Sequence, residues 1–228
     1  MKLKTGAWSF GGSLPKKFEN HISKSVPLYL EGHKIICRLS DYFLKEGSIC
    51  YDIGCSTGNL LVKLNDHTSK KKIQFYGIEK EKSMYNHSKS KIKNRKINII
   101  NKDLTSLKLK KSNLIISYYT LQFNSPSVRQ NLIKKIFKSL EWGGAFIMFE
   151  KIRGNDARFD NILNSLYMDF KEDNKINTND IMSKSKSLRG VLEPFSENGN
   201  LGLLKRAGFK DIQPIVQLLC FKGYLCIK

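Results

Sequence analysis

The sequence predicts an α/β fold in which a mostly parallel seven-stranded sheet ends in a β-hairpin and carries additional helices. Between residues 48 and 149, short apolar runs alternate with segments whose apolar residues recur at helical spacing. This alternation is typical of parallel strands joined by crossover helices. The last twenty residues, 209–228, instead alternate like two consecutive strands, which indicates a hairpin in place of one more strand-helix unit.

Each element of the alternating region follows from a local pattern. Residues 33–45 carry apolar side chains at helical spacing and end near Gly47, after which 48–53 is a short apolar strand. The same reasoning predicts helix 59–66, strand 73–78, helix 81–93, strand 97–100, strand 113–118, helix 127–140 and strand 145–149. Residues 140–144 are expected to form the helix-to-strand turn, because their two glycines can terminate a helix.

Beyond Lys151 the pattern becomes helical. Residues 156–171 and 178–188 are predicted helices, and a shorter one over 200–207 is stopped by Gly208. No repeat, proline-rich segment or Gly/Ser linker divides the chain. We therefore expect one domain over 1–228, with an N-terminal helical extension over 1–46 and a helical insertion over 152–207 that forms a substrate or dimer surface.

Composition limits the class of protein. The 228 residues are 40% hydrophobic, enough for the core of one domain, which excludes general disorder. No segment approaches the roughly 20 apolar residues of a membrane span, and Met1 to Gly6 lacks the apolar stretch of a signal peptide. We expect a cytoplasmic protein without membrane association. The five cysteines form no CxxC pair, which predicts reduced, buried thiols and no metal site.

The net charge of +20 can concentrate phosphate-bearing partners at the surface. Of the 40 basic residues, however, only 7 are Arg, the side chain on which nucleic-acid readers rely. A solvated lysine-rich surface is the favoured interpretation, and contact with nucleic acid or an anionic substrate is the alternative.

A glycine-containing loop follows the first strand, with the sequence Asp52-Ile53-Gly54-Cys55-Ser56-Thr57-Gly58. At such a position glycines let the backbone close around a ligand, and free amides face it. A dinucleotide site would need G-x-G-x-x-G to admit a pyrophosphate, and an acid here repels phosphate but attracts an ammonium group. The loop therefore suits S-adenosylmethionine better than NAD. We assign to cofactor binding Asp52, Gly54, Cys55, Ser56 and Gly58.

Acidic residues follow the next two strands at positions where a nucleoside would lie. Glu79 can accept hydrogens from both ribose hydroxyls, and Lys80 after it is counted with the site although it turns away. Asp103 can accept from an adenine amino group, and Leu104 can cover the ring. The cofactor site is therefore expected at the carboxyl ends of the first three strands.

Six short segments recur in the order found in one known family: Phe18-Glu19-Asn20-His21-Ile22-Ser23-Lys24-Ser25-Val26-Pro27-Leu28-Tyr29, Tyr51 to Gly58, Tyr119-Thr120-Leu121-Gln122-Phe123, Glu150-Lys151, Asp169-Phe170-Lys171 and Ala207-Gly208-Phe209. The ordered set covers nearly the whole chain and resembles the carboxy-S-adenosylmethionine synthases of the class I methyltransferase superfamily. The S-V-P-x-Y and T-L-Q-F segments are not general methyltransferase motifs.

This resemblance implies a homodimer with the Rossmann-like class I methyltransferase fold, holding S-adenosylmethionine or carboxy-S-adenosylmethionine. In the family, S-adenosylmethionine and prephenate give carboxy-S-adenosylmethionine, which a partner enzyme transfers to the wobble uridine of tRNA. By position, Tyr29 would lie near the sulfonium substituent and Tyr118 would line the pocket. The resemblance also implies roles for residues already assigned above: the amino-acid end on Gly54, Cys55 and Ser56, the ribose on Glu79, and the adenine on Asp103 and Leu104.

The chain departs from the family at positions that distinguish carboxyl transfer from methyl transfer. The arginine expected near Ala207-Gly208-Phe209, which pairs with the transferred carboxylate, aligns with Leu203, and a leucine cannot pair with a carboxylate. Other departures are Glu79-Lys80 for an Asp-Asn pair, Tyr118 for an asparagine, and a degraded segment from Lys184 to Gly190. The cations that could replace the arginine are Arg153, Arg189 and Arg206.

Two reactions and one passive function remain open at this point. Methyl transfer from S-adenosylmethionine to a small-molecule acceptor is favoured, with Tyr29, Tyr118 and Glu150 as catalytic candidates and His21 as a further candidate base. The alternative is carboxy-S-adenosylmethionine synthesis, in which the sulfonium methyl loses a proton and captures CO₂, and cations hold a dianionic acid. A module that binds the ligand without turnover is the third.

Overall fold

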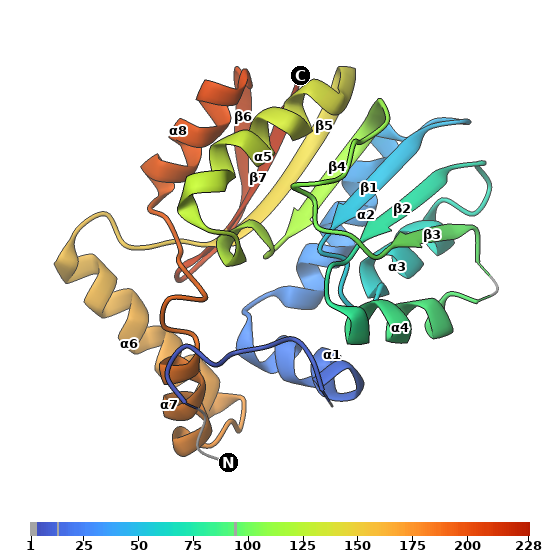
Figure 1. Ribbon diagram of the computed structural model, residues 1–228. Coiled ribbons are helices and arrows are strands. Elements are labelled where there is room, and N and C mark those ends of the chain that lie inside the picture. Colours follow the sequence, from blue (N-terminus) through green and yellow to red (C-terminus); the bar gives the residue numbers. More distant parts are fainter. Residues whose placement is uncertain (1–3, 13, 94) are drawn as a thin grey trace.

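A single seven-stranded sheet forms the centre of the computed structural model, which describes residues 4–12, 14–93 and 95–228. Its strands are β1 (Ile49–Ile53), β2 (Gln74–Ile78), β3 (Ile97–Ile100), β4 (Ser112–Tyr118), β5 (Leu140–Lys151), β6 (Asp211–Leu218) and β7 (Phe221–Ile227). The strand order is β3-β2-β1-β4-β5-β7-β6 (Figure 1). The first five strands are parallel, and β7 runs antiparallel between β5 and β6. The predicted sheet and its C-terminal hairpin are confirmed.

Helices cover both faces of the sheet and its lower edge (Figure 1). They are α1 (Leu14–Ser25), α2 (Tyr29–Phe43), α3 (Asn59–His67), α4 (Lys82–Lys91), the 3-10 turn η1 (Leu121–Phe123), α5 (Pro126–Ser139), α6 (Ala157–Asp173), α7 (Thr178–Ser187) and α8 (Glu197–Ala207). Apolar side chains of α2 and α3 pack on one face, and those of α5 and α8 pack on the other. The sheet is therefore enclosed on both sides, as parallel sheets require.

The two faces are separated by the alternation of side chains along the central strands. On β4, Leu114 and Ile116 join the core under α2 and α3, while Ile115 between them joins the core under α5 and α8. All three are fully buried. Burial of each such side chain stabilises the fold by about 1.5 to 3 kcal/mol. The central strands are therefore rigid, and so are their carboxyl ends, where the candidate site lies.

The start of β5 differs from the prediction. Residues 140–144 do not form a turn before the strand, because β5 already begins at Leu140. Its first part is irregular: Gly143 has a φ of 74°, and the register shifts between Ser112 and Leu114 of β4. Gly143 N–H donates to Lys228 C=O and Lys228 N–H to Gly144 C=O, at 2.8 and 3.0 Å. The glycines therefore permit a bulge that pairs with the end of the chain.

The N-terminal helical extension predicted over 1–46 consists of two helices. The bounds of α1 were not predicted, and α2 begins at Tyr29 instead of residue 33. Together with α6 and α7, α1 lies below the carboxyl ends of the parallel strands (Figure 1). Tyr167 of α6 donates its hydroxyl hydrogen to Ser25 C=O at the end of α1, with an oxygen–oxygen distance of 2.8 Å. Segments far apart in the sequence thus meet beneath the sheet.

The five cysteines are all buried and free, as predicted. Within residues 4–12, 14–93 and 95–228, no helix combines the length and the apolar character that a membrane span needs.

Candidate active site

A cavity of about 700 Å³ lies where the carboxyl ends of the strands meet α1, α6, α7 and the N-terminal segment. Most of the residues assigned from the sequence are brought together in its wall. The assigned residues that line the cavity are Tyr29, Asp52, Gly54, Cys55, Ser56, Glu79, Lys80, Asp103, Leu104 and Tyr118. Gly58 and Glu150 are not part of this lining.

The loop after β1 is shaped by close backbone packing. Gly54 has a φ of 69°, and a Cβ at this position would lie 2.4 Å from the Thr120 side chain. Gly54 and Cys55 both donate their N–H to Ile78 C=O, at 2.8 and 3.1 Å, which ties the loop to β2. Gly58 has a φ of 77° and forms the N-cap of α3, so its contribution is to start the helix. The loop is therefore a rigid cradle at the end of β1.

Glu79 connects this loop to the turn after β2. Its Oε2 accepts from Ser56 N–H at 2.9 Å, and its Oε1 accepts from Glu81 N–H at 2.8 Å. Burial raises the pKa of Glu79 despite these hydrogen bonds. Asp52 lies behind it, only 2% exposed, and burial together with the Glu79 charge raises the pKa of Asp52 to about 7. Two carboxylates thus lie at this end of the cavity in an environment that favours a cationic partner.

The third pair of assigned residues lies in the loop after β3. Asp103 Oδ1 accepts from the Thr105 N–H and hydroxyl at 2.8 and 2.7 Å. Burial acts to raise the pKa of Asp103, but these hydrogen bonds and nearby lysines lower it. Leu104 is buried, and its C=O accepts from Lys135 Nζ at 2.8 Å. The carboxylate and the leucine are therefore held in place as an acceptor beside an apolar surface.

An aromatic cluster forms the wall between α2 and β4. The Tyr29, His33 and Tyr118 rings lie with centroids 4.8 to 5.1 Å apart, and Tyr118 donates its hydroxyl hydrogen to Tyr29 C=O at 2.6 Å. Burial raises the pKa of both phenols well above its usual value, so they are protonated at neutral pH. Gly32 allows this packing, because a Cβ there would lie 2.2 Å from Tyr118 Oη.

These features fit an adenosyl sulfonium compound. Asp52, Glu79 and Asp103 line the cavity and can accept hydrogens from an ammonium group and from ribose hydroxyls. Gly54 lets the loop pack directly against the Thr120 side chain, which also lines the cavity. The Nε2 atom of His33 is buried without a hydrogen-bond partner, which leaves one polar group of the wall available to a ligand. Glu19 of α1 also lines the cavity and accepts a hydrogen bond from the Thr57 hydroxyl. It was not among the site residues predicted from the sequence.

Glu150 lies outside the cavity lining, contrary to its proposed catalytic role. It is 3% exposed and accepts from Leu121 N–H at 3.1 Å, which holds η1 against β5. Burial raises the pKa of Glu150 to about 8, although the Arg129 charge and backbone hydrogen bonds act in the opposite direction. Glu150 became a candidate through the segment Glu150-Lys151 of the family resemblance. Side chains alternate along β5, and it is Lys151 that lines the cavity.

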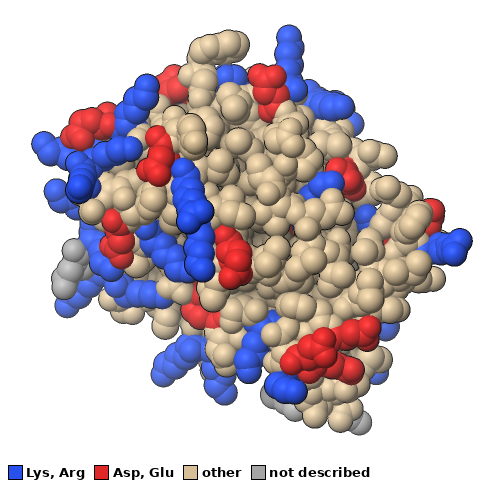
Figure 2. All heavy atoms as spheres, turned by 180° about the vertical axis from the view of Figure 1, so that it is seen from behind, with Lys and Arg blue, Asp and Glu red and all other residues tan. Residues whose placement is uncertain are grey.

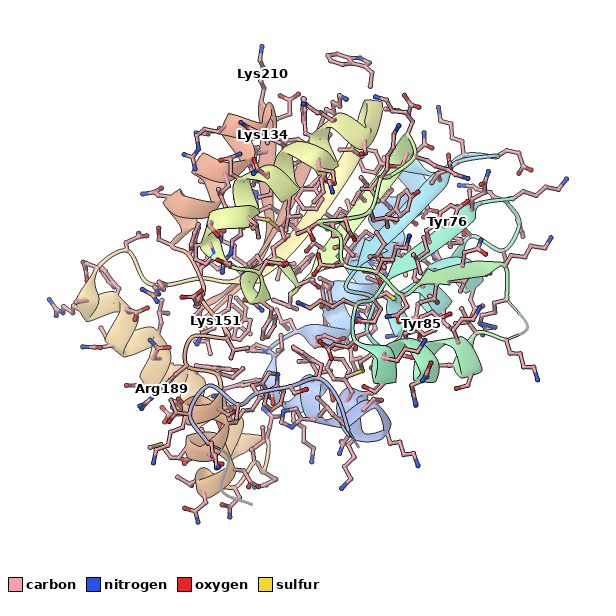
Figure 3. The ribbon with its side chains drawn as sticks, viewed as in Figure 1. Tyr76, Tyr85, Lys134, Lys151, Arg189 and Lys210 are labelled. Atoms are coloured by element: carbon pink, nitrogen blue, oxygen red, sulfur yellow. The ribbon has the colours of Figure 1, made fainter. Side chains whose placement is uncertain are left out.

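Leu203 is not in the cavity either. It is 5% exposed and belongs to the core under α5 and α8, so position 203 supplies no cation to the cavity. The cations that do line the cavity come from other elements: Lys151, Lys171, Lys184 and Arg189. Figure 3 shows Lys151 and Arg189 on the side of the sheet that faces α6 and α7. Of the three arginines considered as replacements, only Arg189 belongs to the lining.

Comparison with known proteins agrees with this geometry. Residues 50–144 match the family described as methyltransferase domain. The chain is 35% identical to a carboxy-S-adenosyl-L-methionine synthase of Staphylococcus epidermidis over 222 residues, 97% of each protein. The chain belongs to the carboxy-S-adenosyl-L-methionine synthase family. A synthase of the same name from Sulfurimonas denitrificans is 31% identical, over 97% of this chain and 94% of that protein.

Solved structures share the fold at low sequence identity. The S-adenosylmethionine-dependent methyltransferase SibL superposes with a TM-score of 0.61 and 12% identity, over 86% of this chain and 54% of that one. The family relationship and the methyltransferase domain together make the protein an S-adenosylmethionine-dependent transferase. They confirm the predicted fold, the resemblance and the cofactor class.

Proposed function

We propose that the protein is a carboxy-S-adenosylmethionine synthase. The sulfonium methyl loses a proton, and the resulting carbanion bonds to the CO₂ that prephenate releases. Prephenate becomes phenylpyruvate as its ring hydroxide leaves and takes up the proton to form water. The observation that carries this proposal is the position of Arg189 in the cavity lining while Leu203 lies in the core. Arg189 can therefore supply the cation that Leu203 lacks. A guanidinium forms paired hydrogen bonds with a carboxylate, which suits Arg189 to the carboxyl group that is transferred.

The distribution of charge along the cavity supports the same reaction. Asp52 in β1, Glu79 after β2 and Asp103 after β3 form one part of the lining. Lys151, Lys171 and Arg189 form another. S-adenosylmethionine supplies the activated methyl carbon at the acidic part. The cationic part is suited to an anionic donor, because cations lower the cost of taking a carboxylate out of water.

Mass spectrometry tests the proposal directly. The small molecule released by denaturing freshly purified protein is expected to be heavier than S-adenosylmethionine by one CO₂. The same product is expected to form when purified protein is incubated with S-adenosylmethionine and prephenate, the donor that the resemblance implies. Release of S-adenosylmethionine or S-adenosylhomocysteine alone, with no product from prephenate, would contradict carboxyl transfer and favour a methyltransferase.

We also propose that the protein acts as a homodimer through the helical insertion 152–207. Phe159, Ile162 and Leu166 lie on one side of α6 and are 55%, 46% and 46% exposed. Apolar residues at this spacing on a helix surface are typical of a face that another surface covers. The insertion would then serve both predicted purposes, because α6 and α7 also line the cavity.

The remaining expectations are proposals as well. The chain forms one domain over 1–228, works in the cytoplasm, and has only an indirect connection to tRNA: a partner enzyme uses its product to modify the wobble uridine. The support for this connection is the family resemblance.

A further inference from the structure

Lys184 of α7 lies in the cavity wall, and among the described residues no carboxylate forms an ion pair with it. Its Nζ contacts His21 Nε2 and lies 4.9 Å from the centroid of the Trp8 ring. In the part of the chain that the structure describes, the ion pairs are His67–Asp41, Arg95–Asp66 and Lys222–Glu197, and none involves Lys184. Burial and the Lys171 charge lower the pKa of Lys184 to about 7. A negative charge beside Lys184 would relieve this unfavourable position.

Trp8 adds a second group that needs a partner. It lines the same cavity, and its Nε1 is buried without a hydrogen-bond acceptor. The backbone at Trp8 is held in place, because its main-chain N–H donates to the C=O of Ser187 at the end of α7, with a nitrogen–oxygen distance of 3.1 Å. A buried indole N–H without an acceptor is destabilising, and it is usually paired in folded proteins. An acceptor from a bound ligand would satisfy it.

His21, the direct contact of Lys184, is a neutral acceptor and does not balance the lysine's charge. Burial and Lys184 lower the pKa of His21 to about 4, whereas Asp180 acts in the opposite direction. The ring is therefore neutral at pH 7 and accepts a hydrogen from Lys184. Asp180 lies one turn before Lys184 on α7 and also lines the cavity, but it forms no ion pair within the described ranges.

Two more lysines extend the positive charge from Lys184 toward β5. The Nζ atoms of Lys171 and Lys151 lie 3.8 and 4.8 Å from the centroid of the Tyr167 ring. Burial and the Lys151 charge lower the pKa of Lys171 to about 8. Lys151 Nζ donates to Asn164 Oδ1 at 3.4 Å, a neutral acceptor. Lys151 and Lys171 contact the same ring, and each charge lowers the pKa of the next lysine in the row. Like charges that act on one another in a partly buried wall indicate that an anion belongs beside them.

We propose that Lys184, Lys171 and the Trp8 indole N–H form a subsite for the carboxylate that the carboxyl donor keeps. This inference rests on the proposed function, because a donor that transfers one carboxyl group and is itself a dianion retains a second one. Arg189 serves the transferred group, and the lysine subsite holds the other end of the same molecule. Two separate cationic positions would orient the donor and favour dicarboxylic acids over monocarboxylic ones.

Trp8 provides a direct measurement of binding. The chain has two tryptophans, and the other, Trp142, is 89% exposed at the start of β5. In a Trp142→Phe protein, the emission of Trp8 alone reports on the subsite. Titration with prephenate is expected to change this emission saturably. In the same background, Lys184→Met is expected to weaken prephenate binding by about tenfold or more, since it removes a charge-assisted contact.

The matched control is Lys186→Met, an exposed lysine of α7 outside the cavity lining. It is expected to bind prephenate as the Trp142→Phe protein does. S-adenosylmethionine affinity, measured by calorimetry, is expected to be unchanged in Lys184→Met, which shows that the variant is folded. In turnover assays, Lys184→Met and Lys171→Met are expected to raise the KM for prephenate and leave the KM for S-adenosylmethionine unchanged.

The outcomes separate this inference from the proposed function. Prephenate affinity within about twofold of the parent in both lysine variants would overturn the subsite, as would no emission change in the parent protein. A loss of prephenate binding in Lys184→Met, together with no carboxylated product from the parent, would support the carboxylate subsite and overturn carboxyl transfer. The twofold limit lies well below the change expected for a charge-assisted hydrogen bond.

Discussion

Individual side chains at the candidate site have two roles. They form hydrogen bonds that order the protein loops, and they are the groups assigned to bind the ligand. Glu79 is assigned to the ribose, and its two oxygens also accept from Ser56 and Glu81 N–H groups. Asp103 is assigned to the adenine and accepts twice from Thr105. Each carboxylate has further lone pairs for a ligand. Cofactor affinity and loop order are therefore coupled through the same atoms.

We predict that Asp103→Ala and Glu79→Ala each weaken S-adenosylmethionine binding by about 1 to 3 kcal/mol, because each leaves buried ligand groups without acceptors. The loss is expected to be larger for Glu79→Ala, which also frees the loop after β1. Isothermal titration calorimetry measures both. Asp66→Ala is the control, because Asp66 is exposed, paired with Arg95 and outside the cavity lining. Unchanged affinity in both site variants would overturn the pocket assignment.

At the scale of elements, the junction between η1 and β5 positions part of the cavity wall. Glu150 accepts from Leu121 N–H, and the Gln122 side chain accepts from Lys151 N–H at 2.8 Å. Arg129 of α5 donates to Gln122 C=O at 3.1 Å. Gln122 and Lys151 line the cavity, whereas Glu150 does not. Glu150 therefore acts on the cavity through the elements that it joins.

The buried Glu150 makes stability depend on pH. Burial raises its pKa from 4.5 to about 8 in the folded state, so the folded protein binds this proton more tightly than the unfolded chain does. Its contribution to stability is complete below pH 4.5 and is lost as the pH rises through 8. We predict that Glu150→Gln, which stays neutral, gains stability relative to the parent protein between pH 5 and pH 9, measured by urea denaturation.

Glu141→Gln is the control for this prediction, because Glu141 is exposed near the other end of β5. The difference between Glu141→Gln and the parent protein is expected to stay constant over the same pH range. If the difference for Glu150→Gln were equally constant, the carboxyl group would have an ordinary pKa in the folded state.

At the scale of the whole molecule, an apolar face and a large positive charge both lie outside the cavity. The apolar face consists of Phe159, Ile162 and Leu166 on α6. On the face shown in Figure 2, basic side chains gather mainly toward one side, with acidic residues among them and a broad uncharged middle. This mixture is typical of a solvated surface, and lacks the continuous basic stripe of a nucleic-acid interface.

We predict that Leu166→Lys converts a dimer into a monomer, because it places a charge in the apolar face of α6. Size-exclusion chromatography with light scattering measures the mass of each species. Asn161→Lys adds the same charge to the same helix outside this face and is expected to leave the dimer intact. A parent protein that is monomeric at all concentrations tested would remove the dimer proposal.

Most of the fold was predictable because its signals are local. β3 agrees residue for residue with the prediction, and β1, β2 and β4 agree within one residue at each end. The apolar period marks these strands directly. α1 lies in the predicted helical extension 1–46, but its own bounds were not predicted, although Leu14, Phe18 and Ile22 recur at helical spacing. The start of β5 was missed because Gly143 in a bulge has the same local signature as a helix cap.

The sequence by itself determined the acidic and glycine-containing half of the candidate site, because those residues directly follow strands that share one edge of the sheet. Only the tertiary structure decided the cationic half. Lys171, Lys184 and Arg189 come from helices and turns far along the chain, and nothing in their local sequence separates them from the many solvated lysines. Linear alignment likewise placed Leu203 at the site, whereas packing of α8 against α5 buries it in the core. Which charges meet depends on how helices pack across the ends of the sheet, and that geometry is not local.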